Sequence, residues 1–129
     1  MSQPEGRITG VGGIFVKSKD PKALAAWYRD VLGLPVEDWG GALLGNRKDG
    51  AEGPPHAVWA PFKSDSDYMQ PSPREFMLDF AVDDLALFLA KLEAKGVMVL
   101  AKSDNDPNGK FAWIMDPDGT KIELWQPKG

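Results

Sequence analysis

The sequence predicts an α+β fold in which one succession of elements, a strand, a helix and three strands, occurs twice. Three observations predict it. An alternating strand leads into an amphipathic helix near the N-terminus, the same pattern returns after residue 74, and a polar stretch separates the two. At 129 residues the chain forms one core, so we expect a single domain over residues 1–129. Its modules are expected at 8–62 and 74–127, with a linker at 63–73.

The first module begins with a strand at 8–17, where residue types alternate loosely. A helix is expected at Pro21–Leu32, because Asp20 can cap its N-terminus and Gly33 can end it. One side of this helix carries an apolar stripe that is expected to face a sheet and to place Trp27 in the core: Leu24, Trp27, Tyr28 and Val31. Three short antiparallel strands are expected next, at 35–39, 42–46 and 56–62.

The second module repeats this order. Residues 76–82 alternate, and Asp84 and Gly96 are the expected ends of a second helix. The Asp-Pro-Asp-Gly sequence at 116–119 is a strong turn signal between the last two strands. The three strands that follow this helix are expected at 97–101, 110–115 and 121–125.

Composition excludes several kinds of function. The net charge of -4 argues against nucleic-acid binding, which needs clustered Lys and Arg. The absence of cysteine removes disulfides and thiolate metal sites, and His56 is the single histidine. No run of about 18 apolar residues and no apolar leader occurs, so neither membrane insertion nor secretion is expected, and the expected location is the cytoplasm.

Three segments resemble the glyoxalase/bleomycin-resistance/dioxygenase family of the vicinal oxygen chelate (VOC) superfamily. They are GGIFVKSKDPKALAAWYRDVLGL at 12–34, FAVDDL at 80–85 with KGV at 95–97, and DPDGTKIELW at 116–125. The resemblance implies that the two modules curl side by side into one curved mixed sheet, a half-barrel cup for a small-molecule ligand. It also implies a homodimer.

Metal-using members of this family hold a divalent ion with His or Glu at four strand positions, and the ion acts as a Lewis acid. Carried over by resemblance, these positions fall at Gly13, Ala57, Met77 and Glu123, of which only Glu123 has a donor. His56 is one residue from Ala57 and is expected on the opposite strand face, in a structural or exposed role. One carboxylate is too few for a catalytic cation, so no metal and no cofactor are expected. The alternative is a divalent metal held with Glu123.

Two acids and several large side chains are the candidate site residues. Strand alternation puts Phe15, Met77 and Asp79 on the cup face, and Glu123 shares a face with Trp125. Asp79 and Glu123 either form a catalytic acid/base pair or have structural roles, with Asp79 hydrogen-bonded in its strand and Glu123 paired with a basic residue. The remaining aromatic candidates either line the cup for a planar ligand or fill it or a subunit interface: Trp39, Trp59, Trp113 and Trp125.

Two classes of function remain open. The first is a metal-free protein that binds a small aromatic or hydrophobic molecule in a tryptophan-lined cup. The second is an enzyme, either a metal-dependent lyase, isomerase or dioxygenase of the glyoxalase family, or a metal-free acid/base enzyme using Asp79 and Glu123.

Overall fold

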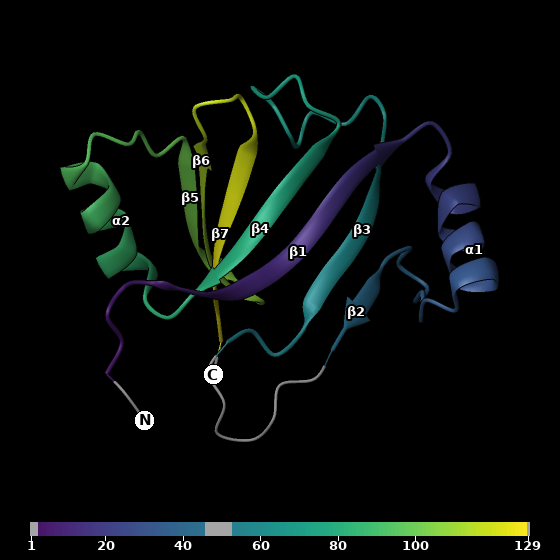
Figure 1. Cartoon of the computed structure of the whole chain (residues 1–129), viewed down its shortest axis with the longest axis horizontal. Coiled ribbons are helices and arrows are strands. Elements are labelled where there is room, and N and C mark those ends of the chain that lie inside the picture. Colours follow the sequence, from purple (N-terminus) through teal and green to yellow (C-terminus); the bar gives the residue numbers. More distant parts are fainter. Residues whose placement is uncertain (1–2, 46–52, 129) are drawn as a thin grey trace.

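The computed structural model describes residues 3–45 and 53–128, which form a seven-stranded sheet and two helices (Figure 1). The elements, in chain order, are β1 (Ile8–Ser18), α1 (Pro21–Leu32), β2 (Ala42–Leu44), β3 (Ala57–Lys63), β4 (Phe76–Val82), α2 (Leu85–Ala94), β5 (Ala101–Asp106), β6 (Gly109–Met115) and β7 (Lys121–Pro127). The predicted α+β class is confirmed. Neither described helix is long and apolar enough to cross a membrane.

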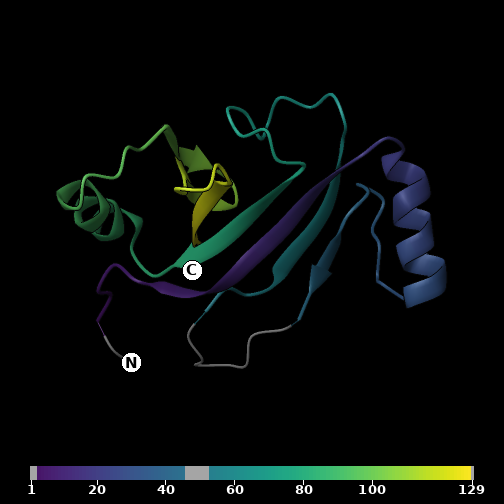
Figure 2. The ribbon, with the colours of Figure 1, turned by 45° about the horizontal axis from the view of Figure 1, so that its top comes forward.

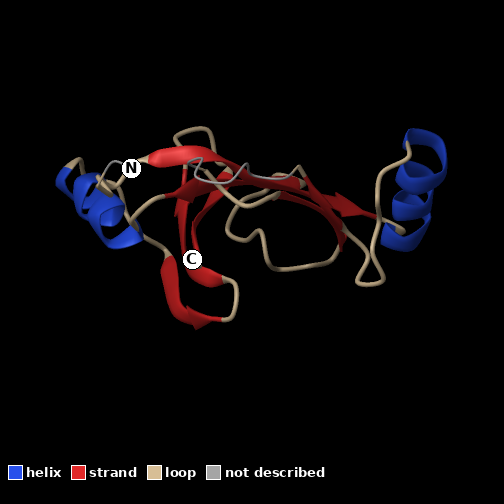
Figure 3. Cartoon of the chain, turned by 90° about the horizontal axis from the view of Figure 1, so that it is seen from below, coloured by secondary structure: helices blue, strands red, loops and turns tan. Residues whose placement is uncertain are grey.

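The sheet has the strand order β2-β3-β1-β4-β7-β6-β5. In each half the first strand pairs in parallel with the last, β1 with β3 and β4 with β7, and the two halves meet where β1 and β4 pair antiparallel. The helices lie at opposite ends of this curved sheet (Figures 2 and 3). The predicted repeat and the curved open sheet are therefore confirmed.

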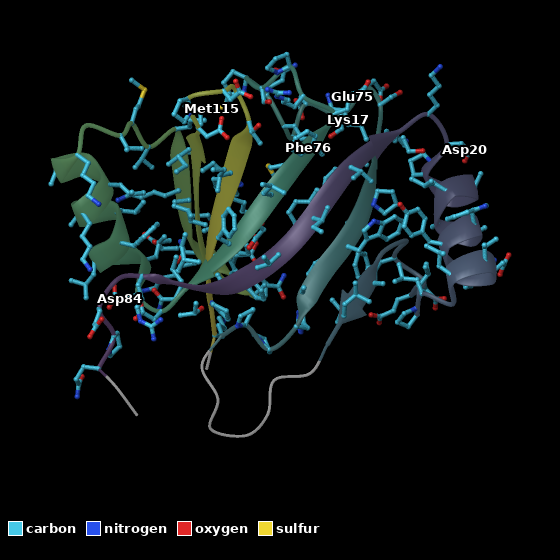
Figure 4. The ribbon with its side chains drawn as sticks, viewed as in Figure 1. Lys17, Asp20, Glu75, Phe76, Asp84 and Met115 are labelled. Carbon is cyan, nitrogen blue, oxygen red and sulfur yellow. The ribbon has the colours of Figure 1, made fainter. Side chains whose placement is uncertain are left out.

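Both helices begin as their sequences predict. The Asp20 side chain accepts a hydrogen bond from Ala23 N–H, and the Asp84 side chain accepts one from Leu87 N–H. Figure 4 shows these two acids at the start of their helices. Gly33 ends α1 with a φ of 73°, a left-handed conformation that favours glycine.

Two strand predictions need correction. The strand expected at 35–39 is reduced to a single bridge between Val36 and Ala42, and the predicted end of the next strand at Asn46 lies outside the described residues. The strand expected at 97–101 instead runs from Ala101 to Asp106 as β5. The N–H of Val97 still donates to the Leu92 carbonyl of α2, so this segment ends the helix before the strand starts.

The helices cover the sheet unequally. Leu85 and Leu89 of α2 pack on Val82, Ala112 and Leu124 to form a buried core.

In α1, by contrast, Ala25 and Tyr28 face the sheet, and the Tyr28 ring stacks on Trp59 with centroids 4.3 Å apart. The prediction that Trp27 is a core residue is wrong, because this rotation of the helix leaves Trp27 51% exposed.

The segment between the halves is more than a polar linker. Met69 is fully buried and packs with Phe15 and Met77. The Ser72 hydroxyl donates to the Gly119 carbonyl, which ties the segment to the turn before β7. Residues 64–73 therefore cover part of the sheet.

Candidate functional site

A cavity of about 700 Å³ lies on the face of the sheet that the helices leave uncovered. Strands from both halves line it, together with the segment before β4 and the turn between β5 and β6. Its walls are largely aromatic, with Phe15, Trp39, Phe62, Tyr68, Phe111 and Trp125. Its polar and charged lining residues are His56, Asp79, Asp106, Asn108, Glu123 and Lys128.

Two carboxyl groups meet in the wall of this cavity. Asp79 on β4 is the direct register partner of Glu123 on β7, and the side chains are only 2% and 3% exposed. Their carboxyls therefore lie beside each other in the wall. The Oε1 atom of Glu123 also accepts a hydrogen bond from the Tyr68 hydroxyl and one of 2.9 Å from Trp113 Nε1.

The pair is expected to hold one proton, because two buried carboxyls side by side disfavour each other's charged form. Burial raises the pKa of Asp79 to about 10, with the hydrogen bond and the charge of Glu123 adding to the effect. Asp79 is therefore a neutral acid at pH 7. Burial and the charge of Glu123 likewise raise the pKa of Tyr68, so its hydroxyl remains a donor. The Oδ1 atom of Asp79 is buried and has no hydrogen-bond partner among the described residues.

Gly12 provides the space beside Asp79. The pairing of β1 with β4 shifts between Val11 and Gly13, which makes Gly12 the extra residue of a bulge. A Cβ atom on Gly12 would lie 2.1 Å from Asp79 Oδ1 and 2.9 Å from the Trp125 ring. Any larger residue would therefore displace the acid pair or the tryptophan.

The structure brings several predicted site residues together. Asp79, Glu123, Phe15, Trp39 and Trp125 all line the cavity.

Met77 and Trp113 lie behind this lining. Met77 is fully buried under Phe15 and Met69, and Trp113 supports Glu123 and packs edge-on against Tyr68.

The predicted cavity position of Trp59 is wrong. On β3, Val58, Ala60 and Phe62 face the cavity, so alternation turns Trp59 toward Tyr28 of α1. The same alternation corrects His56. It lines the cavity, with its ring centroid 5.8 Å from that of Trp125.

Four contributors were missed in the sequence. Tyr68 and Met69 are the large apolar side chains of an otherwise polar stretch, and this contrast was the available signal. Lys121 fixes Tyr68 in place: its Nζ donates to the Tyr68 carbonyl at 2.6 Å and lies 5.4 Å from the ring centroid. The sequence pattern does not indicate the role of Gly12, because that role depends on the bulge in β1.

The residues present do not fit the divalent metal of the family. Of the four carried-over positions only Glu123 has a donor, and its Oε1 accepts hydrogen bonds from two protein groups. Within 3–45 and 53–128, no group of three or more His, Asp or Glu is placed to hold a metal ion. The groups that the described site itself offers for chemistry are the carboxyl pair and its aromatic surroundings.

Comparison with known proteins agrees with this fold. The family described as glyoxalase-like domain matches residues 13–125. Methylmalonyl-CoA epimerase from Mycobacterium tuberculosis is 20% identical with a TM-score of 0.66, over 100% of this chain and 93% of that one. A methylmalonyl-CoA epimerase in complex with methylmalonyl-CoA and NH4+ is 16% identical with a TM-score of 0.71, over 95% and 97%.

A glyoxalase/bleomycin resistance protein/dioxygenase superfamily member from Vibrio splendidus 12B01 is 18% identical, with a TM-score of 0.57 over 90% of this chain and 97% of that chain. No curated protein gave a significant match. At these identities the structural neighbours show a shared fold, while the family match spans most of the sequence. The chain belongs to the glyoxalase-like domain family.

Proposed function

We propose that this protein binds a small aromatic or hydrophobic molecule in the cavity, with the Asp79–Glu123 pair as its polar anchor and without the family's metal. The volume of about 700 Å³ is typical of small-molecule sites, which combine apolar walls with a few polar groups. Phe15, Phe111 and Trp125 offer flat surfaces on which a planar ligand can stack.

The carboxyl pair is the observation that carries this proposal. Burying two acids costs stability, and an unpartnered buried oxygen adds to that cost. A network built only for folding would satisfy that oxygen or replace the acids with apolar groups. Groups with strongly shifted pKa values in a cavity are typical of functional sites.

The same pair supports a second candidate, a metal-free enzyme that moves a proton. Neutral Asp79 can donate and Glu123 can accept, so both roles of acid/base catalysis lie side by side. Methylmalonyl-CoA epimerases are among the structural neighbours, and one of them is in complex with methylmalonyl-CoA. A CoA ester carries several phosphates, whereas Lys128 is the one Lys or Arg among the described lining residues. We therefore rank simple binding first.

A ligand screen tests this proposal. Uncharged and charged aromatic compounds would be titrated into ¹⁵N-labelled protein while the indole N–H signals of Trp113 and Trp125 are followed. Compounds that bind are expected to shift both signals. The Glu123→Gln variant is expected to bind these compounds at least about fivefold more weakly, because one acceptor oxygen is lost. Glu75→Gln, an exposed change, is the control and should bind like the wild type.

Two results would contradict the proposal. One is binding that leaves both indole signals in place. The other is one tightly bound Ni, Zn, Mn or Fe ion per chain that raises the thermal midpoint and is removed by chelator. The homodimer that the family resemblance implies remains a prediction, and light scattering of the purified protein measures it.

A further inference from the structure

Acidic groups outnumber basic ones in the described lining of the cavity. Its deepest polar groups are the Asp79–Glu123 pair, and Asp106 adds another acid at the wall. The balancing Lys128 is exposed near the C-terminal end of β7. An anionic ligand would meet acids in the described lining, whereas a cation would meet carboxyls and the faces of aromatic rings, both of which attract it.

The hydrogen bonds at the pair leave one oxygen without a partner. Tyr68 and Trp113 both donate to Oε1 of Glu123. Asp79 Oδ1, by contrast, has no hydrogen-bond partner among the described residues and is buried against Gly12 in the wall of the cavity. A ligand N–H directed at this oxygen would satisfy it, and a positively charged donor would also remove the need for the shared proton.

We propose that the Asp79–Glu123 pair exchanges its shared proton for the cationic amine of an aromatic ligand. This inference rests on the proposed binding function and narrows its ligand class to aromatic amines. In the exchange no covalent bond to carbon changes. The ammonium group enters and donates a hydrogen bond to the Asp79 carboxylate, and the proton of Asp79 leaves to solvent. The complex therefore carries one positive charge less than the separate protein and ligand together.

The titratable groups that line the cavity with Asp79 fit this exchange. They are Glu123 on β7, Tyr68 in the segment before β4, His56 just before β3, Asp106 on β5, and Lys128. Burial and Glu123 raise the pKa of Asp79, whereas a bound cation lowers it. Affinity for an amine is therefore expected to rise with pH below the pKa of the amine itself.

Three probes of one shape test the ligand class: 1-naphthylmethylamine, 1-naphthalenemethanol and 1-naphthaleneacetate. Titration calorimetry at pH 7 in two buffers of different ionisation enthalpy gives the affinity and the number of protons released. The amine is expected to bind at least about tenfold more tightly than the alcohol, as charge-assisted hydrogen bonds are the stronger kind, and the acetate most weakly. The amine is expected to release close to one proton.

Variants connect the effect to the pair. Asp79→Asn should abolish proton release and bring the amine close to the affinity of the alcohol, and Glu123→Gln should weaken the amine more than the alcohol. Asp104→Asn, the same substitution at an exposed position on β5, should leave both measurements unchanged. Circular dichroism confirms that each variant is folded.

The outcomes separate the two proposals. Binding in which the alcohol or the acetate equals the amine, or in which no proton is released, overturns the exchange and leaves the binding function intact. An amine preference that survives in both Asp79→Asn and Glu123→Gln also overturns it. Failure of all three probes to bind contradicts both proposals.

Discussion

The two halves of this chain share an order of elements but differ in how they use it. In the C-terminal half, α2 buries Leu85 and Leu89 against the sheet. In the N-terminal half, α1 buries Ala25 and leaves Trp27, Val31 and Leu32 more than half exposed. A repeated topology therefore does not imply repeated packing, and the C-terminal half carries more of the apolar core.

The cavity face shows the opposite asymmetry. At the equivalent positions of the two first strands, β1 has Gly13, preceded by the bulged Gly12, and β4 has the fully buried Met77. The Asp79 carboxyl packs directly against the backbone of Gly12, whereas the Met77 side chain fills the matching place in the other half. One half thus supplies the glycines that let the acid approach, and the other supplies the two acids and the packing beneath them.

The largest expected effect tests the unequal helices. Leu89→Ala should lower the free energy of unfolding by about 2 to 4 kcal/mol, because it leaves a hole in a buried cluster. Val31→Ala, at a position 60% exposed, should change it by less than about 0.5 kcal/mol. Urea denaturation measures both, and equal losses would show that α1 is packed as tightly as α2.

The next effect tests the glycine side of the cavity. Gly12→Ala should cost about 1 to 3 kcal/mol and shift the Trp125 indole signal, because its Cβ overlaps Asp79 and Trp125. Gly10→Ala is the control, since its Cβ would meet only the Pro54 side chain, at 3.0 Å. If Gly12→Ala were as mild as the control, the close approach at the bulge would be disproved.

The acid pair of the C-terminal half is tested by the dependence of the free energy of unfolding on pH. The pKa of Asp79 lies at 3.8 in the unfolded chain and is raised to about 10 by folding, so the folded state favours the protonated acid. Its stabilising contribution is complete below pH 3.8 and is lost progressively as the pH rises toward 10. Asp79→Asn cannot ionise and should therefore be more stable than the wild type at pH 7 to 8.

This difference in stability should disappear near pH 4. Denaturation curves of both proteins between pH 4 and 9 measure it. A variant that is less stable than the wild type at pH 8, or a difference that is independent of pH, would mean that Asp79 is ionised in the folded protein.

The smallest expected effect concerns the segment that covers the pair. Tyr68→Phe removes the hydroxyl that donates to Glu123 and should cost about 1 kcal/mol. Tyr28→Phe, which keeps the ring stacked on Trp59 at the sheet edge, is the matched control and is expected to cost less. A smaller loss for Tyr68→Phe than for the control would show that the segment is held by packing alone.

The sequence predicted the features that depend on local chemistry. Asp20, Gly33 and Asp84 mark helix ends through backbone hydrogen bonds within a few residues, and the structure confirms them. The sequence could not predict which way Trp59 faces, because the direction of each side chain on β3 is known only once a neighbouring strand fixes the register. The assumed equivalence of Trp59 with Trp125 placed both in the cavity, and only Trp125 lies there.

The site was predictable in part for the same reason. Asp79 and Glu123 lie at matching places in two clearly alternating strands, so their meeting follows from the topology. The hydrogen bond of Tyr68 to Glu123 spans 55 residues of chain, and the role of Gly12 depends on an irregular strand pairing, so the sequence predicted neither contact.

Asp79 and Glu123 are expected to share one proton in the wall of the cavity. The carboxyl ¹³C signal of Asp79, followed from pH 4 to pH 11 in labelled protein and assigned with Asp79→Asn, reports this proton. We expect Asp79 to stay protonated through pH 7 and to titrate near pH 10. A titration completed below about pH 5, as for an ordinary aspartate, would contradict it.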